Sequence, residues 1–87
     1  MEIKSCQWDD WNVDHIARHG VEPEEVEQVF RHRPFIQKGK RGRYLAYGQT
    51  DAGRYLTVVF EYLGQNRADI VTARDMVRKE RKRFRKR

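Results

Sequence analysis

The residues with the clearest chemical potential lie near the C-terminal end of the chain, in the segment VTARDMVRKERKRFRKR. A helix that begins early in this segment places four arginines at helical spacing, in one stripe. These are Arg74, Arg78, Arg81 and Arg85. Guanidinium groups bind phosphate through paired hydrogen bonds and stabilise the charge that builds on phosphorus during group transfer. The stripe therefore predicts a phosphate-binding surface.

Glu80 is the single acidic residue among residues 78–87, which also hold eight bases. We expect it to share the inner face of a C-terminal helix with Val77 and Phe84. Two roles are open to its carboxylate. It can orient an arginine as an ion-pair partner, which is the favoured reading, or it can act as a general base.

Histidine is the side chain best suited to proton transfer near neutral pH, and the two candidates on a predicted helix are His15 and His19. His15 lies four residues before His19, a spacing that a zinc site can use. No HExxH or CxxC pattern supplies a clear third ligand, so we expect no metal and no other cofactor. The chain also lacks a Gly-rich phosphate loop and a GxSxG motif, which argues against a nucleotide-dependent enzyme and an acyl hydrolase.

RNA cleavage needs no metal when the 2′-OH is the nucleophile, because a base, an acid and a cation over the phosphate suffice. Aromatic side chains can add stacking on unpaired bases. Tyr44, Tyr47 and Tyr55 fall in predicted strands and are available for this, with packing inside the sheet as the alternative.

Charge is distributed unevenly along the chain, whose net charge is +6. Residues 1–30 hold eight acids and two bases, residues 31–44 hold six bases and no acid, and residues 78–87 have a net charge of +7. Basic blocks of this size favour binding to the phosphates of nucleic acid, although a solvated helix end is the alternative for the tail. The expected RNA-binding residues are Arg43, Tyr44, Arg78, Lys82 and Arg85.

The elements that must position these residues follow from periodicity and turn signals. We expect one domain over residues 1–87, with strands at 1–8, 35–38, 43–48, 54–63 and 68–74. Helices are expected from Asp9 or Asp10 up to Gly20, from Pro23 up to Pro34, and from about Val77 onward. Short Gly-containing turns pair consecutive strands antiparallel. The fold class is therefore α+β, a two-layer domain with N-terminal helices, an antiparallel meander of about four strands and a basic C-terminal helix.

Compartment is predicted from the cysteine count and the apolar pattern. Cys6 is the single cysteine, which excludes an internal disulfide and favours a reducing, cytoplasmic environment. No signal peptide is evident at the start, and the most apolar stretch, residues 56–63, is too short to cross a bilayer.

In the order of its motifs the chain resembles the BrnT toxins of type II toxin–antitoxin systems. The resemblance covers nearly the whole chain and rests on Trp8-Asp9, Arg18-His19-Gly20-Val21, Thr72-Ala73-Arg74 and Lys79-Glu80-Arg81. It implies a fold similar to RelE-type ribonucleases, metal-independent endoribonuclease activity and growth arrest. It also implies neutralisation by a BrnA-like ribbon-helix-helix antitoxin, through which the complex contacts operator DNA.

The resemblance also implies roles for particular residues. Arg74, Lys79 and Arg81 are expected to bind and stabilise the scissile phosphate, while His19 or Glu80 handles the proton. The alternative is a non-catalytic module on the same fold that binds nucleic acid or a partner protein, since arginines alone are compatible with either reading.

Overall fold

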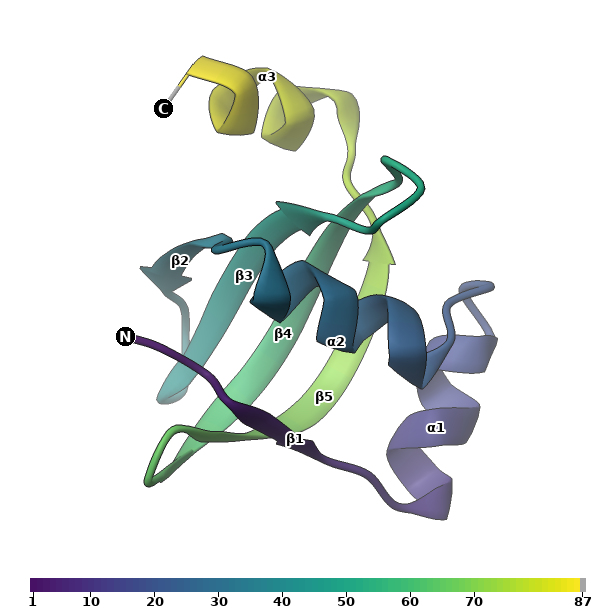
Figure 1. Ribbon diagram of the computed structural model, residues 1–87, viewed down its shortest axis with the longest axis vertical. Coiled ribbons are helices and arrows are strands. Elements are labelled where there is room, and N and C mark those ends of the chain that lie inside the picture. Colours follow the sequence, from purple (N-terminus) through teal and green to yellow (C-terminus); the bar gives the residue numbers. More distant parts are fainter. Residues whose placement is uncertain (87) are drawn as a thin grey trace.

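A computed structural model describes residues 1–86 as one five-stranded sheet with three helices (Figure 1). The elements in chain order are β1 (Ser5–Gln7), α1 (Asp10–Ala17), α2 (Pro23–Arg31), β2 (Phe35–Lys38), β3 (Arg43–Gln49), β4 (Tyr55–Gly64), β5 (Arg67–Asp75) and α3 (Arg78–Lys86). The strand order across the sheet is β1-β5-β4-β3-β2. The predicted α+β class is confirmed. In the described part of the chain, none of the helices has both the length and the apolar character of a membrane span.

The sheet differs from the prediction at one edge. Strands β2 to β5 form the expected antiparallel meander, but β1 joins it by pairing parallel to β5, with Ser5 opposite Arg67 and Gln7 opposite Asp69. Turn signals in the sequence reveal pairing between consecutive strands only. A parallel pair joins segments that are distant in the sequence, so no local pattern predicts it.

Helix α1 begins where the sequence offers two adjacent aspartates. Asp9 is the cap: its carboxylate accepts a hydrogen bond from the Asn12 backbone N–H at 2.8 Å, and the Asn12 side chain accepts one from the Asp9 backbone N–H at 2.9 Å. The Asn12 amide also donates to the Gln7 carbonyl at 2.9 Å, so this buried residue ties α1 to β1. Such a reciprocal cap satisfies backbone donors that the first turn leaves free.

Helix α2 lies across one face of the sheet and packs against β3 and β4 (Figure 1). Its apolar stripe is buried at Val26 and Val29. Gly48 in β3 permits the close approach, because a Cβ there would lie 2.9 Å from Cγ1 of Val29 and 3.2 Å from Cβ of Pro34. A larger residue at position 48 would force Val29 or Pro34 to shift.

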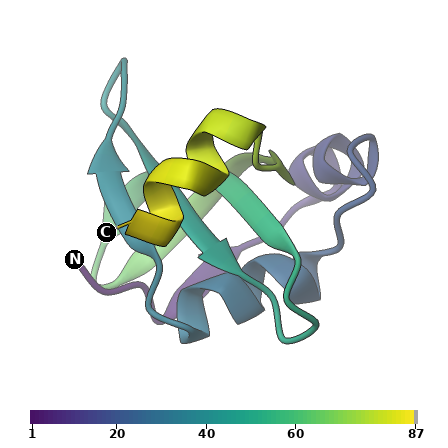
Figure 2. The same ribbon diagram turned by 90° about the horizontal axis from the view of Figure 1, so that it is seen from above.

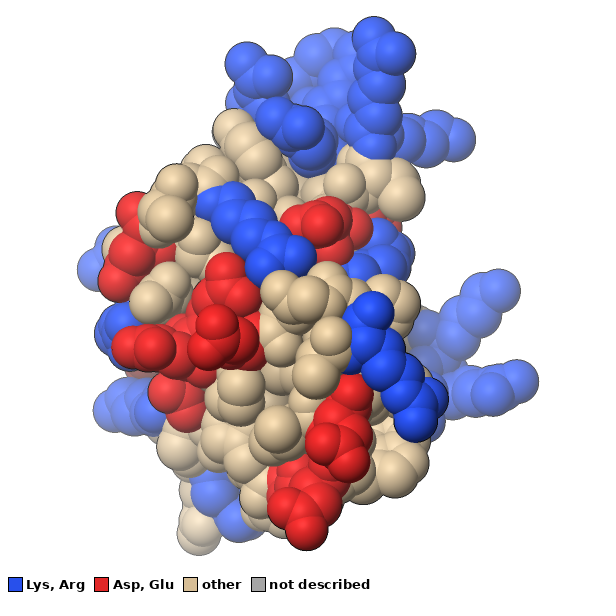
Figure 3. Space-filling model, turned by 90° about the vertical axis from the view of Figure 1, so that its right-hand side faces the viewer, with Lys and Arg blue, Asp and Glu red and all other residues tan. Residues whose placement is uncertain are grey.

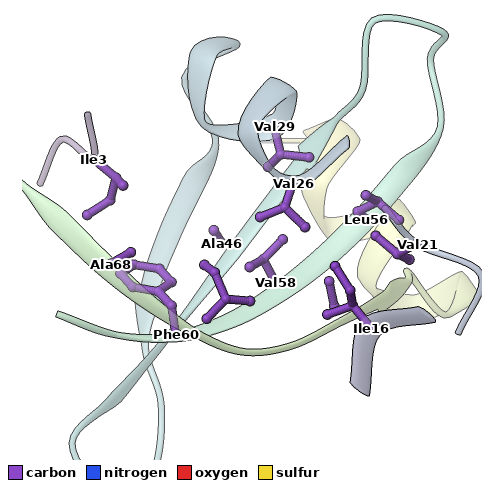
Figure 4. Close-up of a cluster of buried hydrophobic side chains, with 12 residues drawn as sticks. Ile3, Ile16, Val21, Val26, Val29, Ala46, Leu56, Val58, Phe60 and Ala68 are labelled. Atoms are coloured by element: carbon purple, nitrogen blue, oxygen red, sulfur yellow. The ribbon is translucent and has the colours of Figure 1, made fainter. Parts of the chain in front are cut away.

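The core lies between the sheet and the first two helices (Figure 4). Alternation along β4 points Leu56, Val58 and Phe60 into it, and all three are fully buried. Ile16 of α1 and Val26 of α2 close it from the helix side. Residues of β4 at odd positions consequently face the opposite side of the sheet, where α3 lies.

Helix α3 crosses over the strands at the end of the sheet where β5 finishes, as the view from above shows (Figure 2). Glu80 and Phe84 of α3 are half-buried, as expected for residues on the inner face of this helix. Val77 was predicted to share that face but precedes the helix and is 54% exposed. It lies between β5 and α3, where its backbone N–H donates to the Glu80 carboxylate at 3.0 Å.

Candidate functional site

Three neighbouring strands present a row of polar side chains beneath α3. The sheet register places Tyr47 of β3 opposite Thr57 of β4, and Thr57 opposite Arg74 of β5. Their side chains lie on the face away from the core, because the flanking Leu56 and Val58 point into it. Thr57 is nevertheless completely buried, since α3 covers this end of the face.

Glu80 of α3 is the hydrogen-bonding centre of this row. Its carboxylate accepts two hydrogen bonds from the Arg74 guanidinium, at 2.8 and 2.9 Å, in a bidentate ion pair. It also accepts from the Thr57 hydroxyl at 2.9 Å and from the Val77 backbone N–H at 3.0 Å. Arg74 is thereby held in one orientation at the strand–helix junction.

Electrostatics keep this pair ionised. The hydrogen bonds from Arg74 are the largest influence on Glu80 and lower the pKa of its carboxyl, against the opposing effect of burial. The same hydrogen bonds raise the pKa of Arg74. Burial raises the pKa of Tyr47, which keeps this phenol protonated beside the two charges.

Aromatic contacts fix α3 over the row. The Arg81 guanidinium carbon lies 4.5 Å from the centre of the Tyr55 ring, in a cation–π contact. The Phe84 ring meets Tyr55 edge-on at a centroid distance of 6.0 Å. Arg81 is therefore held at the same end of the sheet as Arg74, since Tyr55 and Thr57 are two residues apart on one face of β4.

The outer side of α3 carries a shallow basic groove of about 340 Å³. Its lining residues are Arg78, Arg81, Lys82 and Arg85. The predicted arginine stripe is thus present over the helix itself, but Arg74 is not part of it, because the helix begins at Arg78 and Arg74 belongs to β5. Figure 3 shows these basic side chains gathered over α3, with acidic side chains spread over the face below.

Two residues of the predicted set lie away from the junction. His19 follows α1, and its ring lies 6.2 Å from that of His15; none of the contacts among residues 1–86 joins it to Arg74 or Glu80. Tyr44 faces the core side of the sheet, where its ring packs 5.7 Å from Phe60. Tyr44 therefore takes the packing role, because even positions of β3 point toward the helices.

Two further residues of the predicted site, both basic, do not join the row of polar side chains beneath α3. Lys79 is exposed on the first turn of α3 and makes no contact that the structure describes within residues 1–86. Arg43 lies at the far end of β3, with its Nε 3.5 Å from the Glu61 carboxylate. Both cations are accessible to a ligand rather than part of the hydrogen-bonded junction.

Sequence reasoning missed two residues that organise the site. Thr57 could have been noticed as a hydroxyl in the middle of an apolar strand. Arg54 had no local signal: its guanidinium binds Asp75 at 2.7 Å, Glu25 at 3.1 Å and the Gly20 carbonyl at 2.8 Å. Arg54 thus connects the α1–α2 turn to the end of β5, immediately after Arg74.

Among residues 1–86, no group of three or more His, Cys, Asp or Glu side chains is placed to hold a metal ion. The groups present at the junction are oriented cations with a carboxylate and a phenol beside them. Such a set suits a phosphate ester, whose non-bridging oxygens match the guanidinium fork.

The fold and the junction together define a small α+β protein with an oriented arginine beneath a basic helix. Comparison with known families makes this specific, because residues 8–80 match the family of BrnT, the ribonuclease toxin of type II toxin–antitoxin systems. The chain belongs to this family, and the expectation of a ribonuclease toxin is confirmed.

The fold is shared with a solved member of the family. The crystal structure of the Brucella abortus ribonuclease toxin BrnT superimposes with a TM-score of 0.70 over 85% of this chain and 97% of that chain, at 20% sequence identity. At this identity the likeness shows the fold alone. A comparison with curated proteins finds no match.

Proposed function

We propose that the strand–helix junction is the active site of this ribonuclease toxin, and that it cleaves RNA internally without a metal ion. The observation that carries the proposal is the bidentate Arg74–Glu80 pair beneath a basic helix. In the reaction the 2′-oxygen attacks phosphorus and the bond to the 5′-oxygen breaks, which yields a 2′,3′-cyclic phosphate and a 5′-hydroxyl. One proton leaves the 2′-OH and one reaches the departing 5′-oxygen.

Arg74 and Arg81 supply the cations for the phosphate in this proposal, with Lys79 available at the rim. Their positive charge stabilises the charge that develops on the non-bridging oxygens. In the free protein Glu80 holds the guanidinium in the orientation that a phosphate requires, so Arg74 needs little reorganisation when the phosphate replaces the carboxylate as its partner.

Glu80 has two successive roles in the proposed mechanism. In the free protein it orients Arg74. When a phosphate competes for the guanidinium, the carboxylate loses its principal partner, its pKa rises toward the ordinary value, and it can accept the 2′-OH proton. His19 is the other candidate for a proton-transfer step, and its position on the α1 side makes Glu80 the favoured base.

Arg74→Ala tests the assignment of the site. We expect at least a hundredfold loss of cleavage, about 3 kcal/mol of transition-state stabilisation, with the fold retained. Circular dichroism of the purified variant controls for the fold. A folded Arg74→Ala protein that still cleaves RNA and arrests growth at equal expression would remove Arg74 from the site.

Chelation tests the metal-independent route. We expect cleavage to continue in EDTA and to leave 2′,3′-cyclic phosphate or 3′-phosphate ends, because the donor set at the junction does not suit a metal ion. End-group analysis of the products, with and without chelator, provides the measurement. Activity that is lost in EDTA and restored by zinc or magnesium would contradict the mechanism.

Membership of a toxin–antitoxin family supports a proposal for the partner and the compartment. We propose that a BrnA-like ribbon-helix-helix antitoxin neutralises the protein in the cytoplasm, and that the complex reaches operator DNA through the antitoxin. Co-expression with the neighbouring gene, scored by growth and by co-purification, tests this. Growth arrest that such a partner does not relieve would argue against it.

A further inference from the structure

A second basic groove lies on the same sheet face as Arg74, at the opposite end of β3. It surrounds the β2–β3 hairpin and has a volume of about 680 Å³. We call it the hairpin groove. Its cations are Lys38, Lys40, Arg41 and Arg43, and its floor contains the half-buried Leu45 and Val59.

One side-chain contact connects the hairpin groove to the proposed active site. Gln37, which lines the groove, accepts a hydrogen bond from the Arg83 guanidinium of α3 at 3.4 Å. Arg83 in turn lies beside Tyr47 and Glu80. Arg43 precedes Tyr47 by four residues in β3, a distance of about 13 Å along the strand. A flexible chain bound at the junction can therefore run directly into the groove.

The cations of the groove are available to a ligand. Only Arg43 has an acidic partner in the described part of the chain, Glu61 at 3.5 Å. Lys38, Lys40 and Arg41 are exposed and form no ion pair within residues 1–86. The turn gathers these like charges at one place, which is unfavourable without a counter-ion and favourable when phosphates supply one.

The floor determines which nucleic acid fits. Leu45 and Val59 are neighbours across β3 and β4 and offer an apolar surface between the cations. An unpaired base can turn its flat face onto such a surface, whereas a duplex keeps its bases stacked and presents mainly phosphates and 2′-hydroxyls. Single-stranded RNA therefore satisfies both the cations and the floor.

We propose that the hairpin groove is a second RNA subsite, which binds single-stranded RNA next to the cleaved bond through its phosphates and through one base on Leu45 and Val59. This inference rests on the proposed active site at the Arg74–Glu80 junction. It makes the length of the single strand a determinant of affinity, since a dinucleotide fills the junction without reaching the groove.

The test replaces Lys38, Lys40 and Arg41 together by glutamine and retains Arg43 for its contact with Glu61. The matched control replaces Lys4, Arg18 and Arg33, three exposed cations outside the groove, and changes net charge equally. Two quantities are measured: cleavage of a dinucleotide and of a longer single strand, and binding of 2′-O-methyl RNA, which cannot be cleaved, as a function of salt.

We expect the groove variant to bind the longer RNA about tenfold or more weakly, and its log–log salt slope to fall by about 2, or 0.7 for each lost contact. Dinucleotide cleavage should be unchanged. The control variant should show less than half of this loss of affinity for the longer RNA.

Several results would overturn the inference. Unchanged binding of 2′-O-methyl RNA would exclude the subsite, and equal loss in the control would reduce it to net charge. Loss of antitoxin binding with RNA binding retained would assign the groove to the partner protein. Failure of the wild-type protein to cleave any RNA would count against the proposed function instead, because the binding arm tests the groove without cleavage.

Discussion

Glu80 is the residue at which orientation and proton transfer can be separated. Glu80→Gln preserves an oxygen that can accept from Arg74 but removes the basic carboxylate, so we expect kcat to fall by at least a hundredfold, the range of general base catalysis. Activity should not recover at any pH between 5 and 9. Single-turnover cleavage across this pH range gives the measurement.

Thr57→Val provides the control for that substitution, because it removes one hydrogen bond to Glu80 without touching either charge. A neutral-group hydrogen bond contributes about 1 kcal/mol, so a several-fold effect is expected. If Glu80→Gln is no worse than Thr57→Val, Glu80 serves only to position Arg74.

At the residue scale, sequence identified the charged members of the junction but not their geometry. Arg74 and Arg81 were predicted from the spacing of the arginines and Glu80 as the single acid of the basic block, and the structure brings all three to one end of the sheet. Thr57 became part of the site through register with Arg74, a relation between two strands. Tyr44 was predicted to stack on an RNA base, but the pleat of the strand directs its ring toward Phe60.

At the element scale, α3 combines an inner face that attaches to the sheet and an outer face of cations. We predict that replacing Lys82, Arg83, Arg85, Lys86 and Arg87 by glutamine weakens RNA binding and lowers its salt slope by about 0.7 per lost contact. Phe84 is retained because it packs on Tyr55. Cleavage positions should stay the same, since phosphate contacts carry no base information. Arg87 lies outside the residues that the structure describes.

RNA-binding measurements over a range of salt concentrations, together with mapping of cleaved ends, check this prediction. An unchanged slope would make the tail a solvated helix end. A changed cleavage pattern would mean that the tail reads the RNA.

The elements themselves were largely predictable because each has a local cause. Asp9 and Pro23 mark helix starts, and the alternation in β4 defines both faces of the central strand. What no local cause could supply was the parallel β1–β5 pair. The paired residues are 62 positions apart in the sequence. A strand of three residues is too short for its pattern of apolar and polar residues to predict which strand it pairs with.

At the scale of the whole molecule, ion pairs join segments that are distant in the chain, and this predicts acid sensitivity. Arg54 lowers the pKa of Asp75, and Arg74 lowers that of Glu80. A carboxyl with a lowered folded pKa stabilises the fold above its ordinary pKa of about 4, and this contribution disappears as pH falls through the lowered value. Asp69, whose pKa is raised by burial, acts in the opposite direction.

We therefore expect a lower denaturant midpoint at pH 3 than at pH 6. Arg54→Gln, which removes the partner of Asp75, should be less stable at pH 6 and should show a smaller difference between the two pH values. Urea unfolding followed by Trp fluorescence gives both numbers. An equal pH dependence in the variant would show that the Arg54–Asp75 pair contributes nothing to it.

The parallel β1–β5 pair also fixes the order in which a nascent chain can complete its fold. Ser5 cannot pair with Arg67 until Arg67 has been synthesised. At 5–20 residues per second the ribosome needs about 3–12 s to make the intervening segment. The arginine-rich helix is synthesised later still. With the active site proposed at the Arg74–Glu80 junction, we expect that the growing polypeptide does not cleave the RNA being translated before α3 has been made, so a partner made in the same burst of translation has these seconds in which to fold.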